Sequence, residues 1–218
     1  IGGAGGIGSW LCLFLARQGV DIFLYDFDTV SETNIGGQLY ATTDIGVTKT
    51  KSVRNTTLQF SGKDINTLTK YEEDSFTSNY TICAFDNIST RRIMFENWLN
   101  LEDRELFIDG RMLAEGGQII TITKNSTKEE IDFYKDYFLP EESSIPERDC
   151  TYGATSHAGS MVASLIVASF NNYLVNNNSK DILGLDENIE VREQPFFIEF
   201  SYELFYYKKY SIMEYRNK

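Results

Sequence analysis

The chain has 218 residues, which is enough for one large domain with its own core and short for two. With 42% hydrophobic and 24% charged residues it has the composition of an ordinary folded protein, but its formal net charge is −12. So acidic a surface repels nucleic acid and anionic lipid, and no apolar run has the length of a membrane span, so we expect neither nucleic acid nor a membrane as a partner.

The first half of the chain alternates predicted strands and helices, which is the pattern of a parallel α/β sheet. A glycine-rich turn at residues 3–8 comes first, and because such turns normally follow a buried strand, we expect that strand to begin before Ile1. The predicted helices cover residues 9–18, 44–60 and 89–101, with Asp44 as N-cap and Gly62 as stop of the second. The predicted strands cover residues 21–26, 65–72, 80–85, 105–109 and 117–123.

The second half of the chain has a different character. Residues 125–149 are acidic and contain two of the three prolines, which predicts a long loop or a short helix followed by a loop. Residues 155–177 are small and apolar on nearly every side, which predicts a long buried helix, although the same small residues could pack against a partner subunit. Residues 195–215 predict two antiparallel strands with aromatic faces.

The glycine turn and the acidic residue after the strand at 21–26 indicate a nucleotide site. Glycines let the backbone approach a phosphate closely, and the N-terminus of the next helix offers N–H groups and the positive end of a dipole. Asp26, at the end of that strand, is placed to bind a ribose hydroxyl. Dinucleotide-binding dehydrogenases show the same pair, so a nicotinamide-dependent oxidoreductase is one alternative, and a tight turn without a ligand is another.

Lys49 and Asp86 make the nucleotide interpretation more specific. Lys49 lies near the start of the second predicted helix, where it can reach a nucleotide's phosphates. Asp86 follows the strand at 80–85, and because ligands of an open α/β sheet bind beyond the carboxyl ends of its strands, Asp26 and Asp86 should converge on one crevice. A carboxylate beside phosphates needs a cation between them, so Asp86 is a candidate Mg²⁺ ligand. The alternative is an Asp-Asn turn that caps the next helix.

Four motifs resemble those of the ThiF/MoeB family, the bacterial relatives of ubiquitin-activating enzymes. In chain order they are GAGGIG, DFDTVSETNIGGQ, DIGVTK and FDNISTR, within residues 1–91. The resemblance implies a Rossmann-like parallel sheet extended by C-terminal antiparallel strands, usually in a homodimer. It also implies a single adenylation domain over residues 1–218, with a nucleotide-binding part at 1–124, a crossover loop at 125–154, and the buried helix and antiparallel strands at 155–218.

The activity implied by the resemblance is ATP-dependent adenylation of the C-terminal carboxylate of a ubiquitin-like protein or small peptide. The carboxylate attacks the α-phosphorus of ATP and pyrophosphate leaves. Lys49 and Asp86 would act in catalysis, with Asp86 holding Mg²⁺. The residues that the resemblance assigns to ATP are Gly3, Gly5, Gly6, Gly8, Asp26, Asp28, Asn34, Gln38, Lys49 and Asp86.

The sequence departs from the family pattern at three points. Gly37 lies where the family has an arginine in N-x-x-R-Q, and the zinc-binding CxxC pairs are absent, so no zinc is expected. An arginine that an N-terminal helix of the neighbouring subunit usually supplies has no counterpart in these residues. We expect slow ATP–pyrophosphate exchange with ATP binding retained, unless Arg91, Arg92 or a partner subunit supplies the missing charge. A catalytically impaired ATP-binding scaffold is therefore the alternative function.

Three cysteines without a CxxC pair are typical of reducing conditions, so we expect a cytoplasmic protein. Cys150 lies in a P-E-R-x-C segment that resembles one in ThiF-type enzymes, where the cysteine accepts the activated acyl group; an incidental loop cysteine is the alternative. Cys12 and Cys83 lie in apolar segments and are predicted core residues. His157, the single histidine, is predicted to start a helix without a catalytic role; a position near Cys150 is the alternative.

Overall fold

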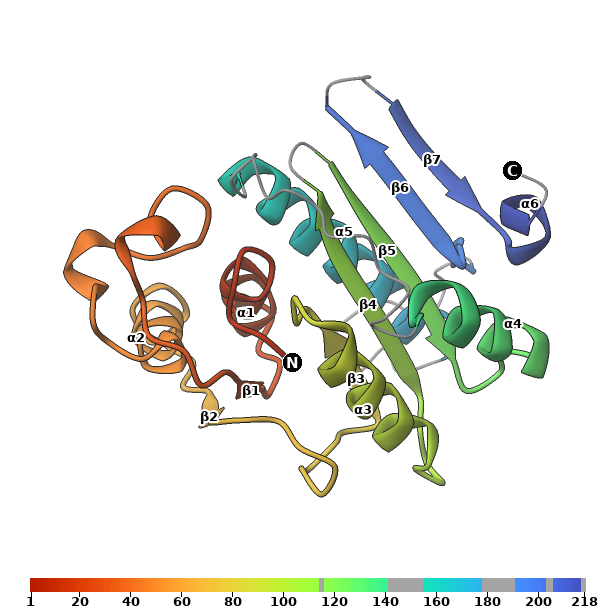
Figure 1. Cartoon of the computed structure of the whole chain (residues 1–218), viewed down its shortest axis with the longest axis horizontal. Coiled ribbons are helices and arrows are strands. Elements are labelled where there is room, and N and C mark those ends of the chain that lie inside the picture. Colours follow the sequence, from red (N-terminus) through yellow and green to blue (C-terminus); the bar gives the residue numbers. More distant parts are fainter. Residues whose placement is uncertain (114–115, 141–154, 178–190, 203–205, 217–218) are drawn as a thin grey trace.

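The computed structural model describes residues 1–113, 116–140, 155–177, 191–202 and 206–216. Its strands are β1 (Phe23–Tyr25), β2 (Asn66–Leu68), β3 (Tyr80–Cys83), β4 (Leu106–Leu113), β5 (Gly116–Thr123), β6 (Phe197–Ser201) and β7 (Tyr206–Tyr210). Its α-helices are α1 (Gly8–Arg17), α2 (Lys49–Ser61), α3 (Ile88–Leu99), α4 (Lys128–Phe133), α5 (Ser156–Asn176) and α6 (Ile212–Arg216). Shorter helical turns are η1 (Glu32–Asn34), η2 (Thr42–Asp44) and η3 (Tyr134–Phe138) (Figure 1).

The strands combine parallel and antiparallel pairing. β1 pairs in parallel with β2, and β3 pairs in parallel with β4. From β4 onward the pairing is antiparallel, in the order β3-β4-β5-β6-β7. Gly2 forms parallel bridges to Tyr25 of β1 and to Cys83 of β3, so the first residues of the chain lie between the two groups of strands. The predicted α/β class, a parallel sheet extended by C-terminal antiparallel strands, is confirmed.

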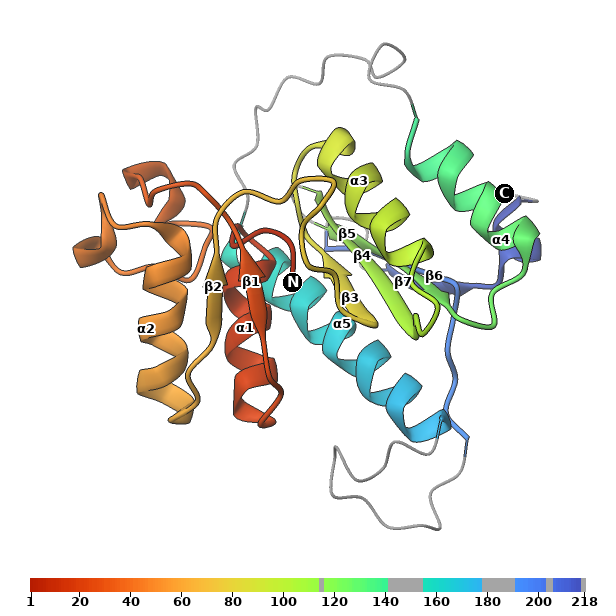
Figure 2. The same cartoon turned by 90° about the horizontal axis from the view of Figure 1, so that it is seen from below.

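Helices cover both faces of the longer strands. Along β4, Leu106 and Ile108 belong to the core cluster that includes α1 and α5, whereas Phe107 belongs to a second cluster with α3. This alternation follows from the two-residue period of a strand. Figures 1 and 2 show α5 on one face of β4 and β5, and α3 and α4 on the opposite face.

The start of α2 differs from the predicted helix boundary. The helix begins at Lys49, and the carboxylate of Asp44 instead accepts the N–H of Ala41, which closes the single turn η2. Gly46 follows with a φ of +85°, a left-handed conformation that ends the turn and prevents it from continuing into α2. The predicted stop is confirmed, because Gly62 has a φ of +70° and its N–H bonds to Leu58.

The predicted buried helix at residues 155–177 is confirmed as α5. Among the described helices it is the one long and apolar enough to cross a membrane, which corrects the expectation that no apolar run reaches this length. However, 61% of its apolar window is buried inside the protein, where it packs against α1, β4 and β5. The apolar composition of α5 is therefore accounted for by its place in the core (Figure 2).

The C-terminal part of the chain contains the predicted short helix and the two predicted strands, together with one further helix. The short helix expected within 125–149 is present as α4, followed by η3, and the two aromatic strands are confirmed as β6 and β7. The one-turn helix α6, which directly follows β7, was not predicted.

Candidate active site

The glycine turn has glycines at points that no other residue can occupy without movement. Gly3 has a φ of +93°, and a Cβ there would lie 2.8 Å from the carbonyl oxygen of Ala84. A Cβ on Gly8, the first residue of α1, would lie 1.8 Å from the carbonyl oxygen of Gly3. The turn is thus closed tightly on the N-terminus of α1, the arrangement that lets backbone N–H groups face a phosphate.

Asp26 lies directly after β1 and contacts the glycine turn. Its Oδ2 accepts the N–H of Ala4 at 2.7 Å, and its Oδ1 accepts the N–H of Asp28 at 2.8 Å. Burial raises the pKa of Asp26, and the Ala4 hydrogen bond opposes that rise. An ionised carboxylate has about four acceptor positions, so these two bonds leave capacity for a ligand hydroxyl.

Lys49 and Asp28 form an ion pair at the start of α2. The Nζ of Lys49 lies 2.8 Å from Oδ2 of Asp28, and the backbone N–H of Lys49 donates to the carbonyl of Asp28 at 2.9 Å. The Lys49 side chain is 10% exposed, whereas that of Asp28 is 51% exposed. A phosphate that approached Lys49 would therefore compete with a solvated carboxylate for the same ammonium group.

The NIGGQ segment lies against the glycine turn. The N–H of Leu39 donates to Oγ of Ser9 at 3.1 Å, and the hydroxyl of Tyr40 donates to the carbonyl of Ala4 at 2.5 Å. These bonds hold Leu39 and Tyr40 against the glycine turn and the first turn of α1, directly after Gln38.

Asn34 and Gln38, both expected to contact phosphates, have different environments. The Oδ1 of Asn34 accepts the N–H of Ser31 at 2.9 Å and so closes the turn η1. The Oε1 of Gln38 is buried and has no hydrogen-bond partner among the described residues. An unsatisfied buried acceptor costs about 1–3 kcal/mol, so Gln38 is the residue of this segment with most to gain from a ligand donor.

The sequence left open whether Asp86 is a Mg²⁺ ligand or part of an Asp-Asn turn that caps the next helix. Asn87 is the N-cap of α3, and its Oδ1 accepts the N–H of Thr90 at 2.8 Å. Asp86 is exposed beyond the end of β3, and its Oδ1 accepts a weak bond from Nδ2 of Asn87 at 3.4 Å. The capping role therefore belongs to Asn87, which leaves the Asp86 carboxylate open to a cation. The described residues contain no cluster of three or more metal-binding side chains.

Arg91 and Arg92, the arginines expected to replace the missing charge beside Gly37, are engaged elsewhere. Arg91 is buried and pairs with Asp109, which is fully buried. Breaking a buried ion pair costs about 3–5 kcal/mol, so Arg91 is held in place. Arg92 donates to the carbonyl oxygens of Leu139 and Pro140. The guanidinium of Arg91 is therefore not free for a phosphate, and one amino group of Arg92 is used by backbone carbonyls.

The structure describes two of the three cysteines, and both are core residues as predicted. Cys12 and Cys83 are fully buried, and burial raises the pKa of Cys12 to about 12 and that of Cys83 to about 11. Both thiols are therefore protonated and unreactive near neutral pH. Cys150 lies outside the described residues.

A cavity of about 470 Å³ lies beside the two glycines of NIGGQ. It is lined by residues from two distant segments, namely Thr33, Gly36, Gly37, Gln38, Thr155, Ser156 and His157. Both segments approach the glycine turn at Gly6. A Cβ on Gly6 would lie 3.8 Å from the Gly37 carbonyl oxygen, and a Cβ on Gly159 would lie 2.2 Å from the Gly6 carbonyl oxygen. Sequence reasoning missed this meeting point, although Gly159 near the start of a predicted helix was a signal of close approach.

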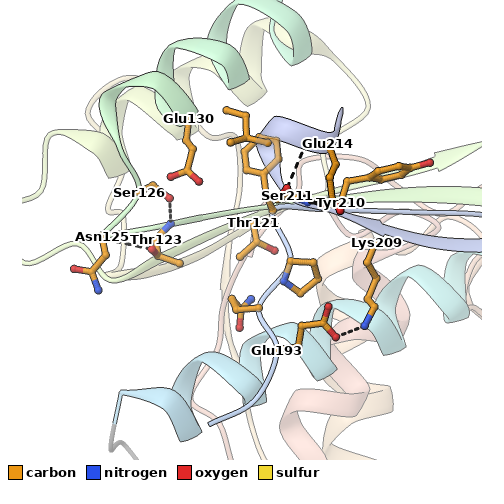
Figure 3. A pocket seen from close by; sticks show the side chains of 14 residues that line it. Thr121, Thr123, Asn125, Ser126, Glu130, Glu193, Lys209, Tyr210, Ser211 and Glu214 are labelled. Carbon is orange, nitrogen blue, oxygen red and sulfur yellow. Dashed lines mark hydrogen bonds and ion pairs between the residues drawn. The ribbon is translucent and has the colours of Figure 1, made fainter. Parts of the chain in front are cut away.

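A second and larger cavity, about 610 Å³, lies near the other end of the strands. Figure 3 shows Thr121 and Thr123 of β5 on its wall, and because Thr123 pairs with Leu106, this is the amino end of β4. Its carboxylates serve local contacts: Glu193 pairs with Lys209, and Glu214 accepts the N–H of Ser211. None of the four sequence motifs contributes to its lining.

Comparison with known proteins places this arrangement in a family. A sequence profile of the ThiF family matches residues 1–198, so the chain belongs to the ThiF family. No curated protein matches the chain.

Solved structures support the same fold. PaaA superposes with a TM-score of 0.67 at 19% identity, covering 96% of this chain and 62% of that one. The microcin C7 biosynthetic enzyme MccB in complex with N-formylated MccA gives 0.69 at 15% identity, with 96% and 63% covered. E. coli MccB crystallised with ATP gives 0.64 at 16% identity, with 96% and 62% covered. The chain thus spans somewhat less than two thirds of these solved relatives.

Proposed function

We propose that this protein adenylates the C-terminal carboxylate of a peptide or small protein with ATP. One observation carries the proposal: the Asp26 carboxylate contacts the glycine turn, and Gln38, whose Oε1 is buried, directly precedes the residue that bonds to Ser9 of α1, with the Lys49–Asp28 pair at the start of α2. Membership of the ThiF family supports it, as do the crystal structures of MccB with ATP and with MccA.

The reaction needs charge stabilisation more than proton transfer. The carboxylate oxygen of the acceptor forms a bond to the α-phosphorus, the bond from that phosphorus to the bridging oxygen breaks, and pyrophosphate leaves with the electron pair. The nucleophile is already ionised at neutral pH, so no general base is required. In the proposal Asp26 binds the ribose, and Lys49 exchanges Asp28 for a phosphate oxygen.

The proposal includes Mg²⁺ on Asp86. An exposed carboxylate at the end of β3 suits an ion that proteins usually hold through one or two carboxylates together with substrate phosphates. When bound, Mg²⁺ would neutralise charge on the phosphates.

The proposal also includes a later step, in which Cys150 takes the acyl group and AMP leaves. Mass spectrometry tests this step: an acyl adduct should appear on Cys150, and its absence during full product transfer would refute the step.

A second candidate is an ATP-binding scaffold with impaired chemistry. Gly37 favours it, because no side chain at this position can stabilise the leaving pyrophosphate and both nearby arginines are engaged. The two candidates share ATP binding and differ in the chemical step.

Nucleotide titration separates both from the oxidoreductase alternative. By calorimetry we expect Mg-ATP to bind more tightly than NAD, and Asp86→Ala to weaken the effect of Mg²⁺ on ATP affinity. Asp74→Ala, which removes another exposed carboxylate, serves as the control. Equal or tighter binding of NAD, or ATP binding that neither Mg²⁺ nor Asp86→Ala changes, would contradict the proposal.

A further inference from the structure

The cavity beside Gly37 contains one side chain that can carry a charge. Among its seven described lining residues, the others are threonines, a serine, glycines and a glutamine, whereas His157 has an imidazole. His157 lies in the first turn of α5 and is exposed. Its ring packs edge-on against Tyr202 at 4.9 Å between centroids, and the Tyr202 hydroxyl donates to the His157 carbonyl at 3.3 Å. Tyr202, which directly follows β6, therefore helps to hold the first turn of α5 in place.

The cavity also adjoins the turn that would hold a nucleotide. Gly159, two residues after His157, allows α5 to approach the carbonyl of Gly6, and a Cβ on Gly6 would lie 3.8 Å from the carbonyl oxygen of Gly37. A triphosphate bound along the glycine turn would extend toward this space, and its charge must be balanced by cations or N–H donors. The first turn of an α-helix supplies free N–H groups, and an imidazole beside a polyanion gains a proton and becomes a cation.

We propose that His157 binds the β- and γ-phosphates of ATP and supplies the positive charge that Gly37 lacks. This inference rests on the proposed adenylation. When the bond from the α-phosphorus to the bridging oxygen breaks, the electron pair goes to pyrophosphate, and His157 stabilises that leaving group. His157 replaces Arg91 and Arg92 in this role, since both are held by other groups. This proposed role differs from the sequence expectation that His157 has no catalytic role.

The single histidine permits a direct test on the unmodified protein. Its imidazole gives one set of NMR signals, because the chain contains no other histidine. Saturating Mg-ATP should shift these signals, and AMP, which has no β- or γ-phosphate, should leave them near their free positions. Equal shifts with AMP and ATP would overturn the inference.

Variants provide the second test. His157→Gln keeps a hydrogen-bonding side chain and removes the cation, so ATP affinity should fall about tenfold or more while AMP affinity stays unchanged. His157→Lys should retain most of the ATP affinity, and Ser164→Ala, on an exposed site of the same helix, should change neither affinity. Equal losses for ATP and AMP would indicate a structural role and overturn the inference.

The outcomes also separate this inference from the proposed function. ATP binding by the unmodified protein that is no tighter than NAD binding would reject the function and the inference together. Tight, Mg²⁺-dependent ATP binding that His157→Gln leaves unchanged would reject the inference alone.

Discussion

Asp26 is the residue whose environment best distinguishes ligand binding from simple support of the turn. Its carboxylate is held by the N–H groups of Ala4 and Asp28, yet burial raises its pKa. The folded protein therefore binds this proton more tightly than the unfolded chain does. The stability that the proton contributes is lost as the pH rises from the ordinary aspartate pKa through the raised value. A buried charge retained at neutral pH at a cost in stability is typical of a functional group.

Asp26→Asn should remove the buried charge and keep an acceptor for Ala4. We expect its free energy of unfolding, relative to the original protein, to increase as the pH rises above about 4, the ordinary aspartate pKa, and through the raised pKa of Asp26. Its ATP affinity should fall roughly tenfold to a hundredfold, because hydrogen bonds to charged groups contribute about 1.5–3 kcal/mol. Urea unfolding and calorimetric titration measure the two quantities. Asp21→Asn, an exposed carboxylate before β1, is the control, and unchanged ATP affinity in Asp26→Asn would show that Asp26 only supports the turn.

At the scale of elements, the site depends on how closely α5 approaches the glycine turn. Gly159→Ala would place a Cβ 2.2 Å from the Gly6 carbonyl oxygen, so one of the two backbones must shift. We expect a loss of about 1–3 kcal/mol in the free energy of unfolding and weaker ATP binding. Ser164→Ala, at an exposed position of the same helix, is the control. Retention of both stability and affinity in Gly159→Ala would contradict the contact between α5 and the turn.

The elements predicted from sequence are those with a strong local pattern. The glycine turn into α1, the buried strand β3 and the apolar helix α5 follow from glycine spacing, a continuous apolar run and small apolar residues. The predicted start of α2 was wrong because Asp44 and Thr48 are both residue types that commonly precede a helix. The left-handed conformation of Gly46 separates the turn at Asp44 from the helix that begins after Thr48. The cavity between Gly37 and His157 could not be predicted, because it depends on packing between segments far apart in the chain.

In the candidate site, too, the sequence predicts residues that lie in short motifs and does not predict contacts between distant segments. Asp26 and Lys49 were assigned from their places after a strand and at a helix start, and Asn34 and Gln38 from the resemblance. In the structure Asp26 contacts the glycine turn, whereas Lys49 pairs with Asp28. The sequence does not reveal that Arg91 is held by Asp109, because that pair joins α3 to β4.

The whole molecule combines an α/β core, which carries the proposed nucleotide site, with antiparallel strands, and it spans 62–63% of the solved structures of PaaA and MccB. The central claim is that this core, with these residues, activates a free carboxylate. ATP binding alone does not establish it, because a scaffold would bind ATP equally well.

The exchange of labelled pyrophosphate into ATP reports formation of the acyl adenylate itself. The acceptor would be a pool of short peptides that vary in their last residue, assayed with Mg-ATP as free acids and, in parallel, with amidated C-termini. We predict exchange with the free acids and none above background with the amides, because only a carboxylate can attack the α-phosphorus. ATP binding without exchange for any free acid would favour the scaffold, and equal exchange with free acids and amides would contradict activation of the C-terminal carboxylate.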